Sequence, residues 1–246
     1  MKEKAKLIFK KVYNNDIFVI SLLLLLKIVF QIIIVNSGFK WLSSDDFCRT
    51  VKSYEWLEKP VINSGVWLTP HFWINGFVMV FVKDIFLAAT LTNVFFSTIT
   101  VYFFYRITLI IFDKKTAVVS TIIFVFFPFQ VWLSISGLPE SVHFFFIIAG
   151  IYYSILYKVH NYKLSYLIIA AIMFAFGNVF RYEGWLFSIV FALYVYYLQI
   201  ILKKQSSINY KALIISSLPF LTILWWLLQN YFDYGTTLYF ASVTNK

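Results

Sequence analysis

The sequence predicts an all-α membrane protein, a polytopic helix bundle that crosses the membrane about seven times. Of its 246 residues, 61% are hydrophobic and 13% are charged, whereas soluble domains have about 45–50% apolar and about 25% charged residues. The aromatic content of 22% and the mean hydropathy of +0.79 exclude a disordered chain as well as a water-soluble globule. The single cysteine, Cys48, excludes an internal disulfide and a thiolate metal cluster.

Seven segments reach or approach the length of about 20 apolar residues that a membrane-spanning helix requires. They are residues 17–35, 85–112, 117–134, 141–157, 164–180, 184–202 and 212–228. A further apolar run, residues 67–82, contains a proline, a histidine, an asparagine and a glycine. If this run crossed the membrane, the basic clusters of all later loops would lie outside, against the positive-inside rule. We therefore expect it to lie in the membrane interface.

The charge distribution predicts the orientation of the chain. Five lysines lie within the first eleven residues and no cleavage signal follows the first apolar run, so we expect a retained helix and a cytoplasmic N-terminus. Most basic residues then lie on the cytoplasmic side and most acids on the extracytoplasmic side, with the plasma membrane as the expected location. The net charge of +10 therefore sets orientation and does not indicate a nucleic-acid partner.

Residues 1–246 are expected to form a single membrane domain whose active site lies on one long external loop, residues 36–84. Ser44 is the expected cap of a surface helix that runs to about Glu58, with two acids in its first turn, where the helix dipole favours negative charge. Thr69-Pro70 is the expected start of a second surface helix. The loop therefore predicts two interfacial helices.

Three short external motifs bring acids and an arginine to one depth of one membrane face. They are Asp45-Asp46, Ser136 to Glu140, and Arg181 to Trp185. Each has a structural explanation, as an acidic first turn of a helix or as an interface anchor. Together they suit group transfer from a lipid-carried donor, because Arg181 can clamp a phosphate and one aspartate can accept the acceptor proton. A departing phosphate needs no general acid.

The motifs resemble, in chain order, the GT-C superfamily of polyprenyl-phosphate-sugar-dependent glycosyltransferases. The resemblance is greatest to the N-terminal seven-span module of the protein mannosyltransferase and aminoarabinose transferase branch. It is carried by Asp45-Asp46-Phe47-x-Arg49, Trp67-x-x-Pro70-His71-Phe72, Ser136-Gly137-Leu138-Pro139-Glu140 and Arg181-Tyr182-Glu183-Gly184-Trp185. The resemblance implies that Asp45 or Asp46 is the catalytic base, that Glu140 lies in the active site and that Arg181 binds the donor phosphate. The further expected substrate contacts are Arg49, His71, Glu183 and Trp185.

The expected partners are a polyprenyl-phosphate-linked sugar, a glycan, lipid or protein acceptor, and membrane lipid. We expect no cofactor; the alternative is a divalent cation on Asp45, Asp46 and Glu140, whose oxygens suit magnesium or manganese. Family members usually contain ten or more spans, so the chain is expected to be truncated at its C-terminus, completed by a partner, or minimal.

Two other classes of function stay open, a non-catalytic membrane subunit of a glycosylation complex and a lipid or sugar transporter. Transporters place charged residues near the bilayer midplane, whereas only Lys27 and Arg106 lie within the expected spans. We expect Lys27 to have a structural role, bonded to a backbone carbonyl or to Asn93.

Overall fold

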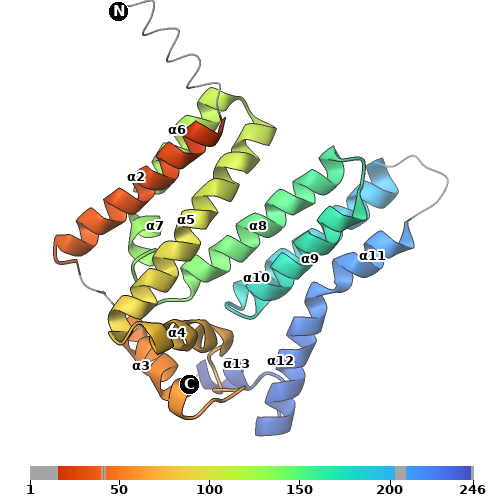
Figure 1. The fold of residues 1–246 in the computed structure, drawn as a ribbon. Coiled ribbons are helices and arrows are strands. Elements are labelled where there is room, and N and C mark those ends of the chain that lie inside the picture. Colours follow the sequence, from red (N-terminus) through yellow and green to blue (C-terminus); the bar gives the residue numbers. More distant parts are fainter. Residues whose placement is uncertain (1–15, 40, 42, 203–208, 245–246) are drawn as a thin grey trace, which may run out of the picture.

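The structure is a computed structural model that describes residues 16–39, 41, 43–202 and 209–244 (Figure 1). The described residues are helical apart from loops and one isolated β-bridge between Ser64 and Trp67, which confirms the all-α class. The lysine-rich segment used to predict the orientation lies outside the described residues.

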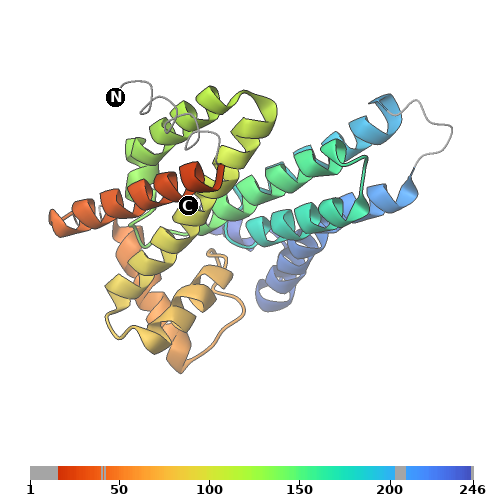
Figure 2. The same ribbon diagram turned by 45° about the horizontal axis from the view of Figure 1, so that its top comes forward.

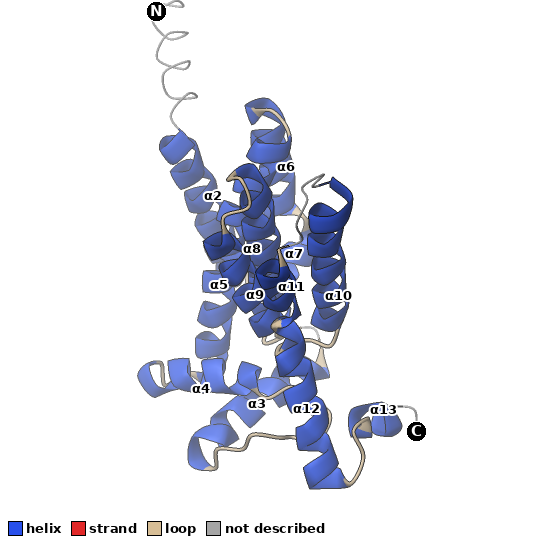
Figure 3. Ribbon diagram, turned by 90° about the vertical axis from the view of Figure 1, so that its right-hand side faces the viewer, coloured by secondary structure: helices blue, strands red, loops and turns tan. Residues whose placement is uncertain are grey.

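Within the described residues, five candidate membrane-spanning segments are long and apolar enough to cross a bilayer. They are α2 (Asp16–Asn36), α5 (Ile85–Ile111), α8 (Glu140–Val159), the segment Glu183–Ile200 made by α10 (Glu183–Tyr196) and the start of the π-helix η1 (Tyr197–Leu202), and the segment Tyr210–Tyr234 made by α11 (Tyr210–Ser217) and α12 (Pro219–Tyr234). These helices stand upright in Figure 3, while α3 (Ser44–Glu58) and α4 (Pro70–Phe81) lie across one end of the bundle. The protein is therefore an integral membrane protein.

Two of the seven expected spans are shorter than a membrane crossing requires. Residues 117–134 form two helices, α6 (Lys114–Phe126) and α7 (Pro128–Leu133), because Pro128 cannot continue the helical hydrogen-bond ladder and Phe127 before it is extended. The 13 residues of α6 span only about 20 Å. Likewise α9 (Leu164–Asn178) has 15 residues. The expectation of seven spans thus stays a prediction.

The two surface helices form where the sequence predicts them. The N-cap of α3 is Ser43 and not Ser44, because Ser43 has the extended backbone and makes a reciprocal capping box with Asp46. Helix α4 begins at Pro70 as expected, but the Thr69 hydroxyl donates to the Ile62 carbonyl and does not cap the helix. Both helices therefore begin where the local sequence favours a helix start, at the capping serine of α3 and at the first-turn proline of α4.

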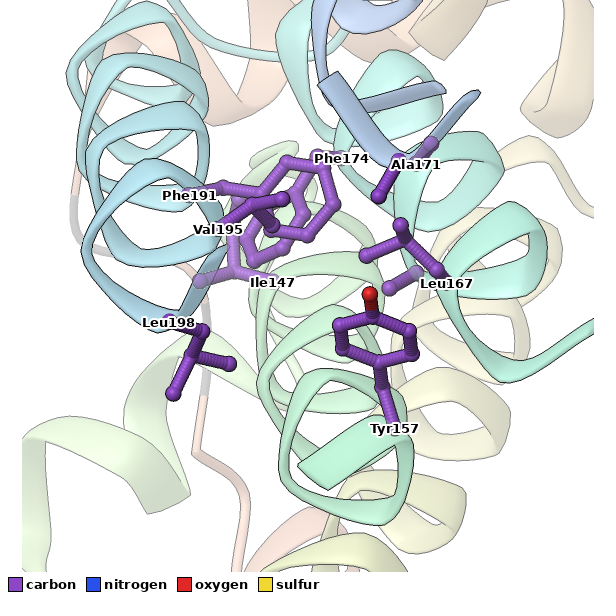
Figure 4. Packing of buried hydrophobic residues seen from close by; sticks show 10 residues of the cluster. Ile147, Tyr157, Leu167, Ala171, Phe174, Phe191, Val195 and Leu198 are labelled. Atoms are coloured by element: carbon purple, nitrogen blue, oxygen red, sulfur yellow. The ribbon is translucent and has the colours of Figure 1, made fainter. Parts of the chain in front are cut away.

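Two apolar clusters hold the upright helices together. One joins α8, α9 and α10, where the rings of Phe174 and Phe191 lie 4.7 Å apart beside Ile147 (Figure 4). The other joins α2, α5 and α6 through residues such as Leu23 and Tyr105. Figure 2 shows these two groups of helices side by side, with α5 and α8 at their junction. The bundle is therefore a scaffold from which the surface helices are positioned.

Lys27 is fully buried in α2 and has a structural role, but its partners differ from the expected ones. Its Nζ donates to Gln130 Oε1 at 2.6 Å and to Ser134 Oγ at 3.1 Å. Asn93 does not contact Lys27 in this way; its amide donates to the carbonyls of Ser136 and Leu138 instead. Lys27 therefore binds α7 and the residue that follows it, and Asn93 binds the turn after α7.

Candidate active site

A buried turn, residues 134–139, connects α7 to α8 and forms the base of the site. Its backbone carbonyls accept hydrogen bonds from side chains of other elements: Trp41 Nε1 donates to Ile135 at 2.7 Å, and Asn93 Nδ2 donates to Ser136 at 2.5 Å. Irregular backbone can be buried at this depth only when its polar groups are paired. The turn is thus fixed relative to both α5 and the surface helices.

Asp46 joins α3 to this turn through its carboxylate. The side chain is fully buried. Its Oδ1 accepts from the Gly137 backbone N–H at 2.9 Å, and its Oδ2 accepts from the N–H and hydroxyl of Ser43. A Cβ at Gly137 would lie 2.7 Å from both the Asp46 carbonyl oxygen and Thr50 Oγ1. The close approach therefore requires glycine.

Asp45, the adjacent residue, is open to solvent. Its side chain is 55% exposed, and its Oδ2 lies 3.7 Å from Nε of Arg49 one turn along α3. The Arg49 guanidinium in turn lies 5.0 Å from the centroid of the Trp67 ring. Burial lowers the pKa of Arg49, while the negative charges of Asp45 and Glu140 oppose this shift. Asp45, Arg49 and Glu140 therefore share one electrostatic environment.

Arg181 links the other two acids of the expected site. Its Nη1 donates to Glu140 Oε1 at 2.5 Å, and its Nε and Nη2 donate to the two carboxylate oxygens of Glu183 at 3.1 and 2.6 Å. Burial acts to lower the pKa of Arg181, but the Glu183 hydrogen bonds and the Glu140 charge outweigh it and raise the pKa. A guanidinium has five N–H donors, so three such bonds leave donors for a ligand. Glu140 Oε2 is buried and finds no partner among the described residues.

His71 lies buried at the start of α4, close to this cluster. Its Nε2 is 3.0 Å from the Asn75 amide nitrogen, and its Nδ1 is buried without a partner among the described residues. Burial and the positive charge of Arg49 lower the pKa of His71 well below its ordinary value. The imidazole is therefore neutral at pH 7.

Trp185 belongs to an aromatic group at the edge of the site. Its ring lies 5.8 Å from that of Phe240 in α13 (Tyr239–Thr244), and Tyr182 stacks on Phe240 at 4.4 Å. The Tyr182 hydroxyl donates to the Val66 carbonyl. A substrate role for Trp185 therefore stays a prediction. The contact between Trp185 and Phe240 could not be predicted from the sequence, because the two positions are far apart in the chain.

An apolar cavity of about 520 Å³ opens between α4, α8, α9 and α12. Its lining includes Trp73 of α4, Phe146 of α8 and Trp225 of α12, and it extends to Phe180, the residue immediately before Arg181. The cavity was not predicted from the sequence, since Phe-rich segments are equally compatible with lipid-facing or core packing. A mainly apolar cavity therefore lies next in the chain to the polar cluster, at Phe180.

The expected cation set of Asp45, Asp46 and Glu140 is not assembled. The described part of the chain holds no group of three histidine, cysteine or acidic side chains that could bind a metal ion. The Asp46 carboxylate instead accepts hydrogen bonds from Ser43 and Gly137. The structure therefore brings together Glu140, Arg181 and Glu183, places Asp45 beside Arg49, and withdraws Asp46 into the scaffold.

Comparison with known protein families gives one match. The family described as dolichyl-phosphate-mannose-protein mannosyltransferase matches residues 69–226, which is more than half of the chain. The matched segment contains Glu140, Arg181 and the apolar cavity. Searches of curated proteins and of solved structures gave no match.

Proposed function

The chain belongs to the dolichyl-phosphate-mannose-protein mannosyltransferase family, and on this premise we propose that it transfers a sugar from a polyprenyl-phosphate donor to an acceptor at the extracytoplasmic face. Membership makes the protein a membrane glycosyltransferase. The observation that carries the assignment of the site is the position of Arg181, which is held by two carboxylates and directly follows Phe180, a residue that lines the apolar cavity. The lipid chain of the donor would contact the apolar cavity, and its phosphate would contact the Arg181 guanidinium.

The donor is proposed to place its polyprenyl chain in the apolar cavity and its phosphate on Arg181. A cavity lined almost entirely by apolar side chains suits an isoprenoid chain, and a guanidinium binds phosphate through paired N–H donors. Glu140 and Glu183 hold Arg181 in place by occupying three of its donors. These acids are therefore positioning residues for the phosphate-binding arginine.

The proposed transfer is a single displacement with Asp45 as general base. The Asp45 carboxylate accepts the proton of the acceptor hydroxyl or amine while that group forms a bond to the anomeric carbon. The bond from the anomeric carbon to the phosphate oxygen breaks, and its electron pair leaves with the phosphate. Arg181 and the nearby Arg49 stabilise that anion. One displacement inverts the anomeric configuration.

The orientation is proposed from the arrangement of the helix ends. Asp16 at the start of α2 pairs with Lys114 at the start of α6, and this end of the bundle lies opposite α3 and α4 in Figure 1. Lys158 and Lys163 lie at the α8–α9 connection, also away from the site. The positive-inside rule then places these ends in the cytoplasm and the site outside.

Donor binding tests the assignment of Arg181. We expect Arg181→Gln to weaken binding of radiolabelled dolichyl phosphate to the detergent-purified protein by about 10- to 100-fold, the value of one lost charged hydrogen bond. Arg106→Gln, near the far end of α5, serves as the control and should bind normally. Equal binding by both variants and the wild type would exclude Arg181 as the phosphate site.

A further inference from the structure

A row of cationic and aromatic side chains follows one face of α3 away from Asp45. With about 100° of rotation per residue, the row falls within about 80° of arc. Its members are Asp45, Arg49, Lys52, Trp56 and Lys59, the last being the residue after the helix. We call Arg49, Lys52 and Lys59 the basic stripe. Lys52 lies two helical turns, about 10.5 Å, beyond Asp45.

Of the three cations of the basic stripe, Arg49 pairs with Asp45, whereas Lys52 and Lys59 have no carboxylate partner among the described residues. Arg49 and Lys52 lie over the same Trp67 ring, at 5.0 and 5.5 Å from its centroid, in the geometry of cation–π contacts. No salt bridge to Lys52 or Lys59 occurs within the described residues. One acid, Glu55, lies at the border of the stripe, so the region keeps a net positive charge.

The outer half of the stripe borders a hollow of about 190 Å³. Lys52 and Lys59 line it together with Trp56, Ser64 and Phe72. This volume corresponds to about six water molecules of the liquid, which is enough for a phosphate-sized group. The hollow and the apolar cavity lie on two sides of the first turn of α4, since Phe72 lines one and Trp73 the other.

The orientation of α3 leaves the outer lysines of the stripe, Lys52 and Lys59, exposed, whereas Arg49 is buried. Phe47, Val51 and Tyr54 are exposed on the opposite side of the helix, at 44%, 42% and 47% exposure. A surface helix places such an apolar face against the lipid. Lys52 and Lys59 therefore point away from the membrane, which favours a soluble anionic group over lipid headgroups.

We propose that the basic stripe binds phosphate or carboxylate groups of a polyanionic acceptor and thereby leads its nucleophile to Asp45. The link to Asp45 rests on the proposed function, whereas anion binding by the stripe does not. Donor and acceptor would then approach from different phases: the lipid-linked sugar from the apolar cavity and the charged acceptor from the aqueous side. The two meet at the arginine and acid cluster.

Binding of tripolyphosphate to the full chain in phosphatidylcholine nanodiscs tests the stripe. We expect the double variant Lys52→Gln with Lys59→Gln to bind roughly 3- to 30-fold more weakly than wild type, from two exposed ion pairs. Lys83→Gln, an exposed lysine just beyond the other end of α4, is the control for lost charge and should bind like wild type. If the double variant binds no more weakly than the Lys83 variant, the proposal is wrong.

Two further measurements separate the alternatives. The double variant should bind dolichyl phosphate normally, and Arg181→Gln should still bind tripolyphosphate. If both variants bind dolichyl phosphate like wild type, the donor site on Arg181 is wrong, but the anion site on the basic stripe is not affected. In nanodiscs with 30% phosphatidylglycerol, the difference between wild type and double variant should persist. If it disappears there, the stripe binds lipid headgroups and the acceptor proposal fails.

Discussion

Asp45 and Asp46 are neighbours in the chain, but their substitutions should have opposite consequences. Asp46→Ala removes the capping box with Ser43, worth about 1 kcal/mol, and leaves the buried Gly137 N–H without its acceptor, at a cost of about 1–3 kcal/mol. We therefore expect a loss of about 2–4 kcal/mol in the free energy of unfolding.

Asp45→Asn should barely change stability but should remove activity. Its side chain is 55% exposed and its pair with Arg49 is 3.7 Å long, so the ion pair contributes about 0–1 kcal/mol. If Asp45 is the general base, the rate of transfer falls by about 10²- to 10⁴-fold.

Both variants can be compared by thermal unfolding in detergent and by transfer of radiolabelled mannose from polyprenyl-phosphate-mannose in membranes, normalised to folded protein. The reasoning is refuted if Asp46→Ala unfolds like wild type. It is equally refuted if Asp45→Asn retains full transfer while Asp46→Asn, at unchanged stability, abolishes it.

Two further predictions follow from the surroundings of the site. Gly137→Ala should destabilise the protein by about 1–3 kcal/mol, because its methyl group would meet the backbone of Asp46 at 2.7 Å. Gly150→Ala is the control and should cost less in thermal unfolding, because its methyl group would meet only a side-chain ring at 3.0 Å. A larger loss of stability in Gly150→Ala than in Gly137→Ala would contradict this packing. Because the pKa of His71 is lowered in the folded protein, His71 becomes protonated in the unfolded chain at a higher pH than in the folded one. The free energy of unfolding should therefore fall as the pH drops below about 6.5, by up to about 1.4 kcal/mol per pH unit. In pH-dependent unfolding, His71→Gln should flatten this slope, whereas a slope removed instead by His160→Gln would refute the assignment.

Capping residues and prolines in the sequence predicted the starts of the two surface helices to within one residue. The acids after Ser43 and the proline at position 70 mark the starts of α3 and α4, because capping and ring geometry act within one turn. The apolar composition of residues 117–134 concealed the break at Pro128, since hydropathy averages over a window and ignores the lost N–H. The partners of Lys27, more than 100 positions away in the chain, could not be identified from its own segment.

Composition and short-range spacing are enough to predict a helical membrane protein with acids and an arginine gathered in three motifs. The exposure of the two adjacent aspartates depends on the tertiary structure, which buries Asp46 and leaves Asp45 open to solvent. Neighbouring residues of a helix point about 100° apart, so the side on which α3 packs buries one and exposes the other. That side is set by the hydrogen bond between Asp46 and Gly137, 91 positions apart, a contact that exists only once the chain has folded.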